Sequence, residues 1–166
     1  SRSSTRGGPA RRLRRRSRKL TPAAYAMIGP VIVSLHVAVG GAAGALLGSR
    51  PLALLLGPPL HVAGDGIPHE DIPDRSFELA SGLLALALLA ARRGPADPAV
   101  LGAATCALPD LEHVAPRLRP GGRKLFHRRG QHGGGLSADT QLLLAGVTVG
   151  WLLGGRPAGA QDPEHA

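Results

Sequence analysis

The sequence predicts an all-α fold, an integral membrane bundle of four or five helices whose polar loops are rich in His and Asp. Apolar residues make up 43% of the chain, but aromatic residues, on which soluble cores rely for buried area, make up only 2%. The apolar residues are mainly Ala, Leu, Gly and Val in long uncharged runs. Small residues let helices approach closely in lipid, and no strand pattern extends beyond a few residues.

The chain divides into three predicted parts. Residues 1–20 contain nine Lys or Arg residues and no acid, which predicts a disordered basic N-terminal tail. Residues 21–155 are the predicted membrane-embedded domain, and residues 156–166 are a predicted disordered C-terminal tail. Beside an apolar segment, the basic tail is typical of a cytoplasmic flank that contacts anionic membrane lipid. Nucleic-acid binding through this tail is an accessory alternative, because the tail lacks aromatic residues for stacking.

The first of five apolar runs covers residues 23–48 and contains no charge, so it is long enough for a tilted membrane span. Gly40, Gly41 and Gly44 give this run a small-residue face suited to tight helix packing.

The four later apolar runs are shorter than the roughly 20 residues that a perpendicular span needs. They cover residues 52–63, 79–91, 99–108 and 142–153. The run 52–63 is interrupted by Pro58-Pro59, which predicts a broken or re-entrant helix. Either these runs extend into the adjacent polar residues as helix ends, or the protein lies partly in the membrane interface.

Loop charges predict a multi-pass protein of the cell membrane. With a cytoplasmic N-terminus and one crossing for each run, loops 65–75 and 110–135 both face the cytoplasm. Residues 113–135 hold six basic residues, as the positive-inside rule requires, whereas Arg92-Arg93 fall on the opposite side. The N-terminus and the site loops are therefore expected in the cytoplasm.

Metal-ligating residue types cluster in the polar loops. His61 and Asp65 are spaced i and i+4, so both lie on one face if this segment is helical. Pro68 would end the helix and let His69 fold back. Imidazole and carboxylate groups on one face are suitable ligands for zinc, manganese or iron.

Two further segments carry the same residue types. Asp110, Glu112 and His113 occupy four positions at the end of an apolar run, and His127 and His132 lie in a Gly-rich loop. Glycine would let that loop fold closely around a site.

Several isolated groups have a structural interpretation beside the functional one. His36, in the middle of the first run, is either a ligand or a hydrogen-bonding group between helices. Glu78 suits the first turn of a helix, next to its dipole, and Cys106 suits a small buried thiol. Asp97, in a predicted loop, indicates no role.

Four sequence elements together resemble a known family. They are Ser34-Leu35-His36, the H-x-x-x-D-x-x-P-H element at 61–69, Leu108-Pro109-Asp110-Leu111-Glu112-His113, and His127-Arg128-Arg129-Gly130-Gln131-His132. They resemble the bacterial inner-membrane proteins classed as membrane-bound metal-dependent hydrolases, of the LexA-regulated type. In that family the usual forms resemble LPDxDH and HRGxTH. Here Glu112 stands for the second Asp, and the element ending at His132 has one extra residue, Arg129, before its Gly and has Gln131 where the Thr would stand.

The resemblance implies metal-assisted hydrolysis in a helical membrane protein. One or two divalent ions, zinc first and manganese or iron as alternatives, would be held by ligands drawn from His36, His61, Asp65, His69, Asp110, His113, His127 and His132. A metal lowers the pKa of its bound water to near neutral. A carboxylate that does not ligate, such as Glu112 or Asp71, would accept the proton, and Arg128 and Arg129 would hold a phosphate.

The expected substrate is a phosphoester, and a lipid reached from the bilayer is one candidate. The alternative class is a non-catalytic helical membrane protein, in which the cluster transports a metal or a proton or holds helices together. An enzyme needs an open coordination position that substrate can reach, whereas a structural site is closed.

Overall fold

The computed structural model describes residues 32–70, 72, 74–115, 117, 119–123, 125–126 and 135–155. Five helices of ten residues or more occur in this part: α2 (Val33–Leu47), α3 (Arg50–Asp65), α4 (Arg75–Arg93), α5 (Pro98–Ala107) and α7 (Ala138–Gly154). The described residues between α5 and α7 form three short elements, namely η1 (Leu108–Asp110), α6 (Leu111–Val114) and η3 (Pro120–Gly122). The described residues contain no strand beyond one isolated bridge between His69 and Leu136, so the predicted all-α class is confirmed. Both predicted disordered tails lie outside the described residues.

Helices α3, α4 and α7 begin and end beyond their apolar runs, in the adjacent polar residues, whereas α2 lies inside its run and α5 ends inside its run. The side chain of Asp74 accepts hydrogen bonds from the first backbone N–H groups of α4, and Asp97 and Ser137 cap α5 and α7 in the same way. Such caps satisfy N–H groups that have no partner within the helix. Among the described helices, none is both long enough and apolar enough to cross a bilayer.

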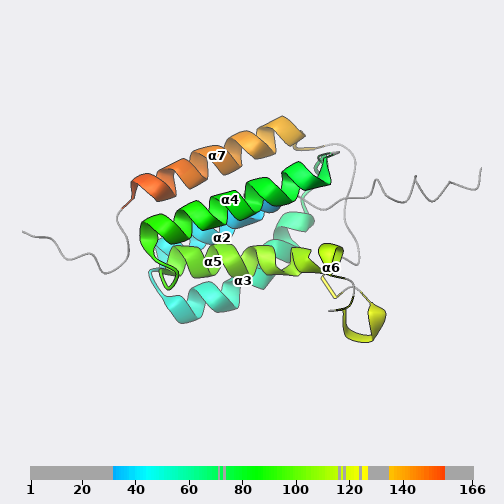
Figure 1. The fold of residues 1–166 in the computed structure, drawn as a ribbon, viewed down its shortest axis with the longest axis horizontal. Coiled ribbons are helices and arrows are strands. Elements are labelled where there is room, and N and C mark those ends of the chain that lie inside the picture. Colours follow the sequence, from blue (N-terminus) through cyan, green and yellow to red (C-terminus); the bar gives the residue numbers. More distant parts are fainter. Residues whose placement is uncertain are drawn as a thin grey trace, which may run out of the picture.

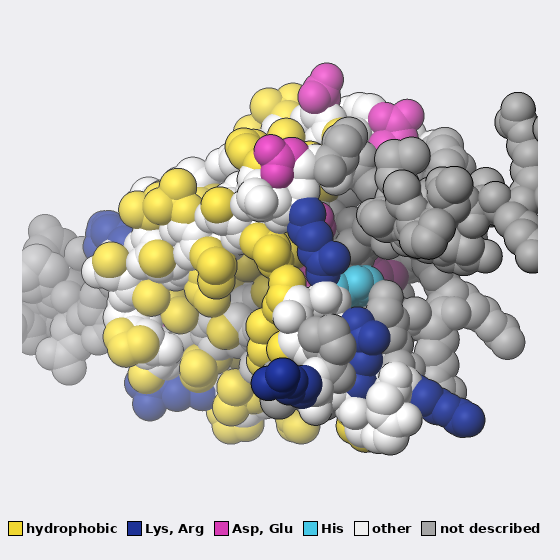
Figure 2. All heavy atoms as spheres, turned by 45° about the vertical axis from the view of Figure 1, so that its right-hand side comes forward, with side chains coloured by type: hydrophobic (Ala, Val, Ile, Leu, Met, Phe, Trp, Pro, Cys, Tyr) yellow, Lys and Arg dark blue, Asp and Glu magenta, His cyan; other side chains and the backbone are white. Residues whose placement is uncertain are grey.

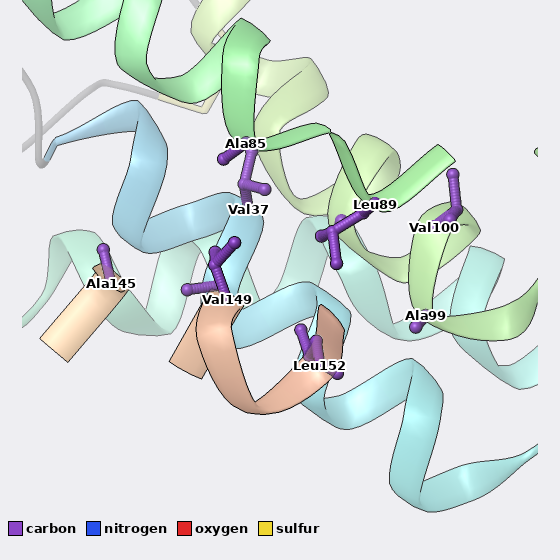
Figure 3. Close-up of a cluster of buried hydrophobic side chains, with 10 residues drawn as sticks. Val37, Ala85, Leu89, Ala99, Val100, Ala145, Val149 and Leu152 are labelled. Carbon is purple, nitrogen blue, oxygen red and sulfur yellow. The ribbon is translucent and has the colours of Figure 1, made fainter. Parts of the chain in front are cut away.

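Helix α2 packs against all four of the other long helices, and Figure 1 shows α7 and α3 on opposite sides of the bundle. The hydrophobic core lies around α2. It includes Val37 of α2, Leu89 of α4, Val100 of α5, and Val149 and Leu152 of α7 (Figure 3). This packing brings the start of α2 and the ends of α3 and α5 to one end of the bundle, where the polar residues gather.

Glycines set the close contact between α2 and α5, as the sequence predicted. A Cβ added at Gly40 would clash with the carbonyl oxygen of Gly102, and one added at Gly44 would clash with that of Pro98. The third predicted glycine, Gly41, faces Leu152 of α7 instead. The small-residue face of α2 therefore contacts two neighbouring helices.

Replacement of Gly40 by alanine is expected to lower the free energy of unfolding by about 1–3 kcal/mol, because overpacking forces the two backbones apart. The matched control is Gly146→Ala on α7, where an added Cβ meets no atom within 4 Å. Alanine favours a helix over glycine by roughly 1 kcal/mol, so the control should be neutral or stabilising. Denaturant unfolding followed by circular dichroism measures both, and equal midpoints for the two variants would contradict the tight α2–α5 contact.

The predicted break at Pro58-Pro59 is wrong, because α3 runs from Arg50 to Asp65 with both prolines inside it. Each proline removes a backbone N–H donor and would ordinarily kink or end the helix. Here α3 packs closely on α5, where a Cβ at Gly57 would clash with Thr105. This tertiary packing offsets the proline penalty and keeps the end of α3 beside the end of α5.

Candidate metal centre

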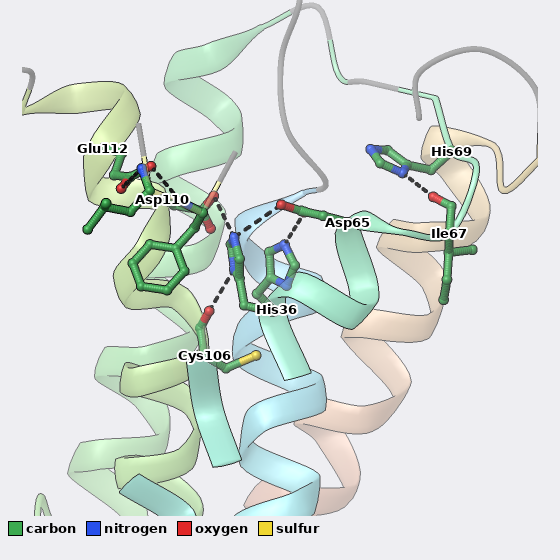
Figure 4. Close-up of polar contacts among 10 residues, drawn as sticks. His36, Asp65, Ile67, His69, Cys106, Asp110 and Glu112 are labelled. Carbon is green, nitrogen blue, oxygen red and sulfur yellow. Dashed lines mark hydrogen bonds and ion pairs between the residues drawn. The ribbon is translucent and has the colours of Figure 1, made fainter. Parts of the chain in front are cut away.

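Four of the predicted ligands come together at one end of the bundle. His36 lies in the first turn of α2, His61 and Asp65 lie in the last turns of α3, and Asp110 ends η1 directly after α5. Figure 4 shows the side chains of His36, Asp65 and Asp110 pointing toward a common region. His36 was expected in the middle of an apolar run, but it lies near the start of the helix that the structure describes.

The distances within this group suit a cation. His36 Nε2 lies 3.3 Å from Asp65 Oδ1, and His61 Nε2 lies 3.3 Å from Asp65 Oδ2 and 4.0 Å from Asp110 Oδ1. One ligand atom from each of His36, His61 and Asp110 lies within 4.8 Å of the others. The two imidazole rings stack with their centroids 3.9 Å apart. We call His36, His61, Asp65 and Asp110 the metal centre.

The tautomer of His61 follows from its hydrogen bond. Its Nδ1 lies 2.8 Å from the backbone oxygen of Cys106, which can only accept, so Nδ1–H is the donor. In the neutral ring, Nε2 then carries a lone pair, and this lone pair faces the carboxylates of Asp65 and Asp110. Three acceptors that face one another require either a proton or a cation between them. An Nδ1–H bond to a backbone carbonyl is the usual support for an Nε2 metal ligand.

The metal centre is almost fully buried. His61 has no exposed surface, and Asp65 is 8% exposed. Burial alone would raise the pKa of Asp65, but hydrogen bonds and charge attraction from His36 and His61, which act when those rings are protonated, outweigh this effect and hold the pKa well below its usual range. The lowered pKa keeps Asp65 ionised, which suits an anionic metal ligand and makes its carboxylate a weak acceptor for a proton.

Two predicted ligands do not join this group. The Nδ1–H of His69 donates to Ile67 O at 2.6 Å, and Figure 4 shows the ring apart from the other histidines. The loop that carries His69 is paired with Leu136, since Leu136 N donates to Pro68 O at 3.0 Å. His113 lies in α6, half-buried, and is outside the three-residue group.

Glu112, the predicted general base, holds a loop in the described structure. Its carboxylate accepts hydrogen bonds from Leu125 N at 2.7 Å and from Phe126 N at 3.3 Å. Its backbone oxygen accepts one from Arg119 Nε at 2.7 Å. The carboxylate and the backbone oxygen of Glu112 thus hold the basic segment after α6 against that helix.

Five predicted site residues lie outside the described residues: Asp71, His127, Arg128, Arg129 and His132. Their predicted roles in proton transfer, phosphate binding and metal binding stay predictions.

Sequence reasoning missed one buried ion pair. Asp97 was read as a loop residue without a role, but its Oδ1 lies 3.1 Å from Arg93 Nε, and both side chains are at most 5% exposed. The spacing of Arg93 and Asp97, four residues apart across Gly94, was the available signal. This pair lies at the C-terminal end of α4, away from the metal centre.

The chain matches no protein-family model, no curated protein and no solved structure. The metal centre must therefore be interpreted from its own chemistry.

Proposed function

We propose that this protein is a membrane-bound, metal-dependent hydrolase that acts on a phosphoester through a metal-activated water. The observation that carries the proposal is the arrangement around His61. The Cys106 carbonyl fixes its Nδ1–H, and its Nε2 faces the carboxylates of Asp65 and Asp110 inside a buried site. The motif resemblance to membrane-bound metal-dependent hydrolases supports the same chemistry.

The donor set favours zinc, with manganese or iron as alternatives. Two imidazoles and one carboxylate, from His36, His61 and Asp110, form a frequent ligand set of catalytic zinc sites, which leave a position for water. Such an ion supplies a water whose pKa is near neutral. Asp65 contacts both histidines, and its lowered pKa would suit a further metal ligand better than the acceptor of the proton from that water.

The surface of the bundle supports contact with lipid. Many large apolar side chains are exposed, among them Leu55 of α3, Leu83 of α4 and Leu143, Val147 and Trp151 of α7. Figure 2 shows apolar side chains over much of one face. Extended apolar surface is rare on soluble monomers, and it marks contact with a membrane or a partner. The basic residues 1–20 would add attraction to anionic lipid.

The burial of the metal centre favours a second candidate, a closed site without catalysis. His36 is 2% exposed and Asp110 is 4% exposed. A structural metal that joins α2, α3 and α5, or a metal in transit, would bind these residues without an open coordination position. Hydrolysis separates the two candidates, since both predict bound metal.

The test of the proposal is the metal content of the purified protein, measured by elemental mass spectrometry, together with hydrolysis of a phosphodiester. The wild type is expected to carry close to one zinc, manganese or iron ion per chain. The double variant Asp65→Ala, Asp110→Ala is expected to lose it, because both facing carboxylates are removed. Asp139→Ala, an exposed carboxylate at the start of α7, is the matched control and should keep the metal.

Bound metal with hydrolysis supports the enzyme, and bound metal without hydrolysis of any tested phosphoester supports the closed site. Absence of metal from a folded wild type, even after incubation with zinc, contradicts both candidates.

A further inference from the structure

An apolar pocket of about 220 Å³ lies between α2, the end of α3 and the segment that leads into α7. We call it the α2–α3 pocket. Its apolar lining side chains are Leu35, Val39, Leu60, Ala63, Ile67 and Leu136. Val39, Ala63 and Ile67 are exposed, so the pocket has a rim at the surface of the bundle.

The pocket is separate from the metal centre. None of the four residues of the metal centre lines it, and the backbone of α3 at Gly64 stands between the pocket and the ring of His36. A ligand of the pocket is therefore not the substrate of the proposed hydrolysis, and its binding does not depend on that proposal.

Gln141 lines the pocket and brings one polar group to it. Its side chain is fully buried, and its Nε2 donates to the backbone oxygens of Glu70 at 2.8 Å and Leu136 at 3.2 Å. Because both of these partners can only accept, they fix the orientation of the amide, and its oxygen is left on the other side. This Oε1 is buried and has no hydrogen-bond partner among the described residues. Buried acceptors without a partner are rare, and this one requires a donor on a bound molecule.

The size and lining of the pocket suit a small apolar molecule better than water. A buried water usually makes two to four hydrogen bonds, whereas the lining is apolar except at Gln141 and at His69, whose Nδ1–H donates to Ile67 O. An apolar cavity of about 150 Å³ is large enough to hold benzene. The α2–α3 pocket, at about 220 Å³, therefore has room for a six-membered ring with one substituent.

We infer that the α2–α3 pocket binds a compact apolar alcohol of about the size of phenol, whose hydroxyl donates to Oε1 of Gln141. The apolar part of this ligand leaves water and contacts the leucines and valine of the lining. The hydroxyl supplies the donor that the buried amide oxygen lacks.

The test compares phenol with toluene, which has the same number of heavy atoms and no donor. Isothermal titration calorimetry of the full chain gives the affinity for each. A purely apolar pocket would bind toluene more tightly by about tenfold or more, because the phenol hydroxyl would lose its hydrogen bonds with water. With Gln141 as the acceptor, phenol is expected to bind at least as tightly as toluene.

The variant Gln141→Met removes the acceptor and keeps an apolar side chain of similar length. Phenol affinity should fall by about tenfold or more, because the buried hydroxyl loses its partner, whereas toluene affinity should stay within a few-fold of the wild type. Addition of a metal chelator should change neither affinity in the wild type, because the pocket contains no residue of the metal centre.

A second variant, Ala63→Phe, fills the pocket from its exposed rim and should weaken the binding of both compounds. Ala87→Phe is the matched control, because Ala87 is an exposed alanine of α4 that does not line this pocket. It should keep both wild-type affinities, including any contribution from other apolar surface. This pair of variants tests the location of the ligand even if Gln141→Met does not fold.

The inference is overturned if toluene binds the wild type about tenfold more tightly than phenol, if phenol does not bind, or if Ala63→Phe keeps the wild-type affinity for phenol. Equal losses of phenol and toluene affinity in a folded Gln141→Met variant would contradict the role of its amide oxygen. The metal content measured for the proposed function is independent of all these outcomes.

Discussion

Replacement of His61 by alanine is expected to lower zinc affinity by at least about a hundredfold, and the rate of phosphoester hydrolysis should fall with it. Loss of a group that only supports a metal ligand already costs about 10–100-fold in metal affinity or activity, and His61 is proposed as a ligand itself. The variant removes an Nε2 that faces both Asp65 and Asp110, and leaves the two buried carboxylates without the group between them. A competition titration against a chromogenic chelator gives the affinity, and steady-state hydrolysis at saturating zinc gives the rate.

The matched control is His69→Ala. His69 is also a buried histidine with its Nδ1–H on a backbone oxygen, but its ring lies apart from the metal centre in Figure 4. This variant should keep zinc affinity within a few-fold of the wild type. Equal losses in the two variants would show that the metal is held by a different set of residues from the one centred on His61.

Replacement of Asp97 by alanine is expected to lower the free energy of unfolding by about 3–5 kcal/mol, the cost of leaving one partner of a buried ion pair alone. The guanidinium of Arg93 would keep its bond to Leu152 O at 3.0 Å but lose its counter-charge. The cap on Ala99 N, at 2.8 Å, would disappear as well. Chemical denaturation measures the change.

Two further variants separate the charge from the cap. Asp97→Asn keeps a side-chain oxygen that can cap α5 and should lose less than Asp97→Ala. The double variant Arg93→Met, Asp97→Ala removes both charges and should be more stable than Asp97→Ala alone. A loss below about 1 kcal/mol in Asp97→Ala would indicate that the pair behaves as a surface salt bridge.

The helical class and half of the metal centre could be predicted from local patterns. His61 and Asp65 are four residues apart in one helix, and a helix period alone places them together. The glycines of α2 were predicted to mediate close packing because a residue without a side chain has that effect in any helix pair.

The remaining parts of the site depend on contacts between distant segments. The distance from His61 to Asp110 is set by the packing of α3 on α5, which also overrides Pro58-Pro59, and neither effect is visible in a local pattern. The role of Glu112 also could not be predicted from a local pattern. Its residue type suits a base, but the backbone N–H groups of Leu125 and Phe126, which occupy its carboxylate, are more than ten residues away.

The four residues of the metal centre all lie between positions 36 and 110, so every one of them is synthesised before α7. The segment that leads into α7 and the helix itself instead contribute Leu136 and Gln141 to the α2–α3 pocket, the apolar pocket of about 220 Å³ that α2 and the end of α3 also line. Helix α7 and the segment before it therefore complete this pocket and supply none of the four residues of the metal centre. Substitutions in α7 can therefore reshape this pocket while the four residues of the metal centre stay the same.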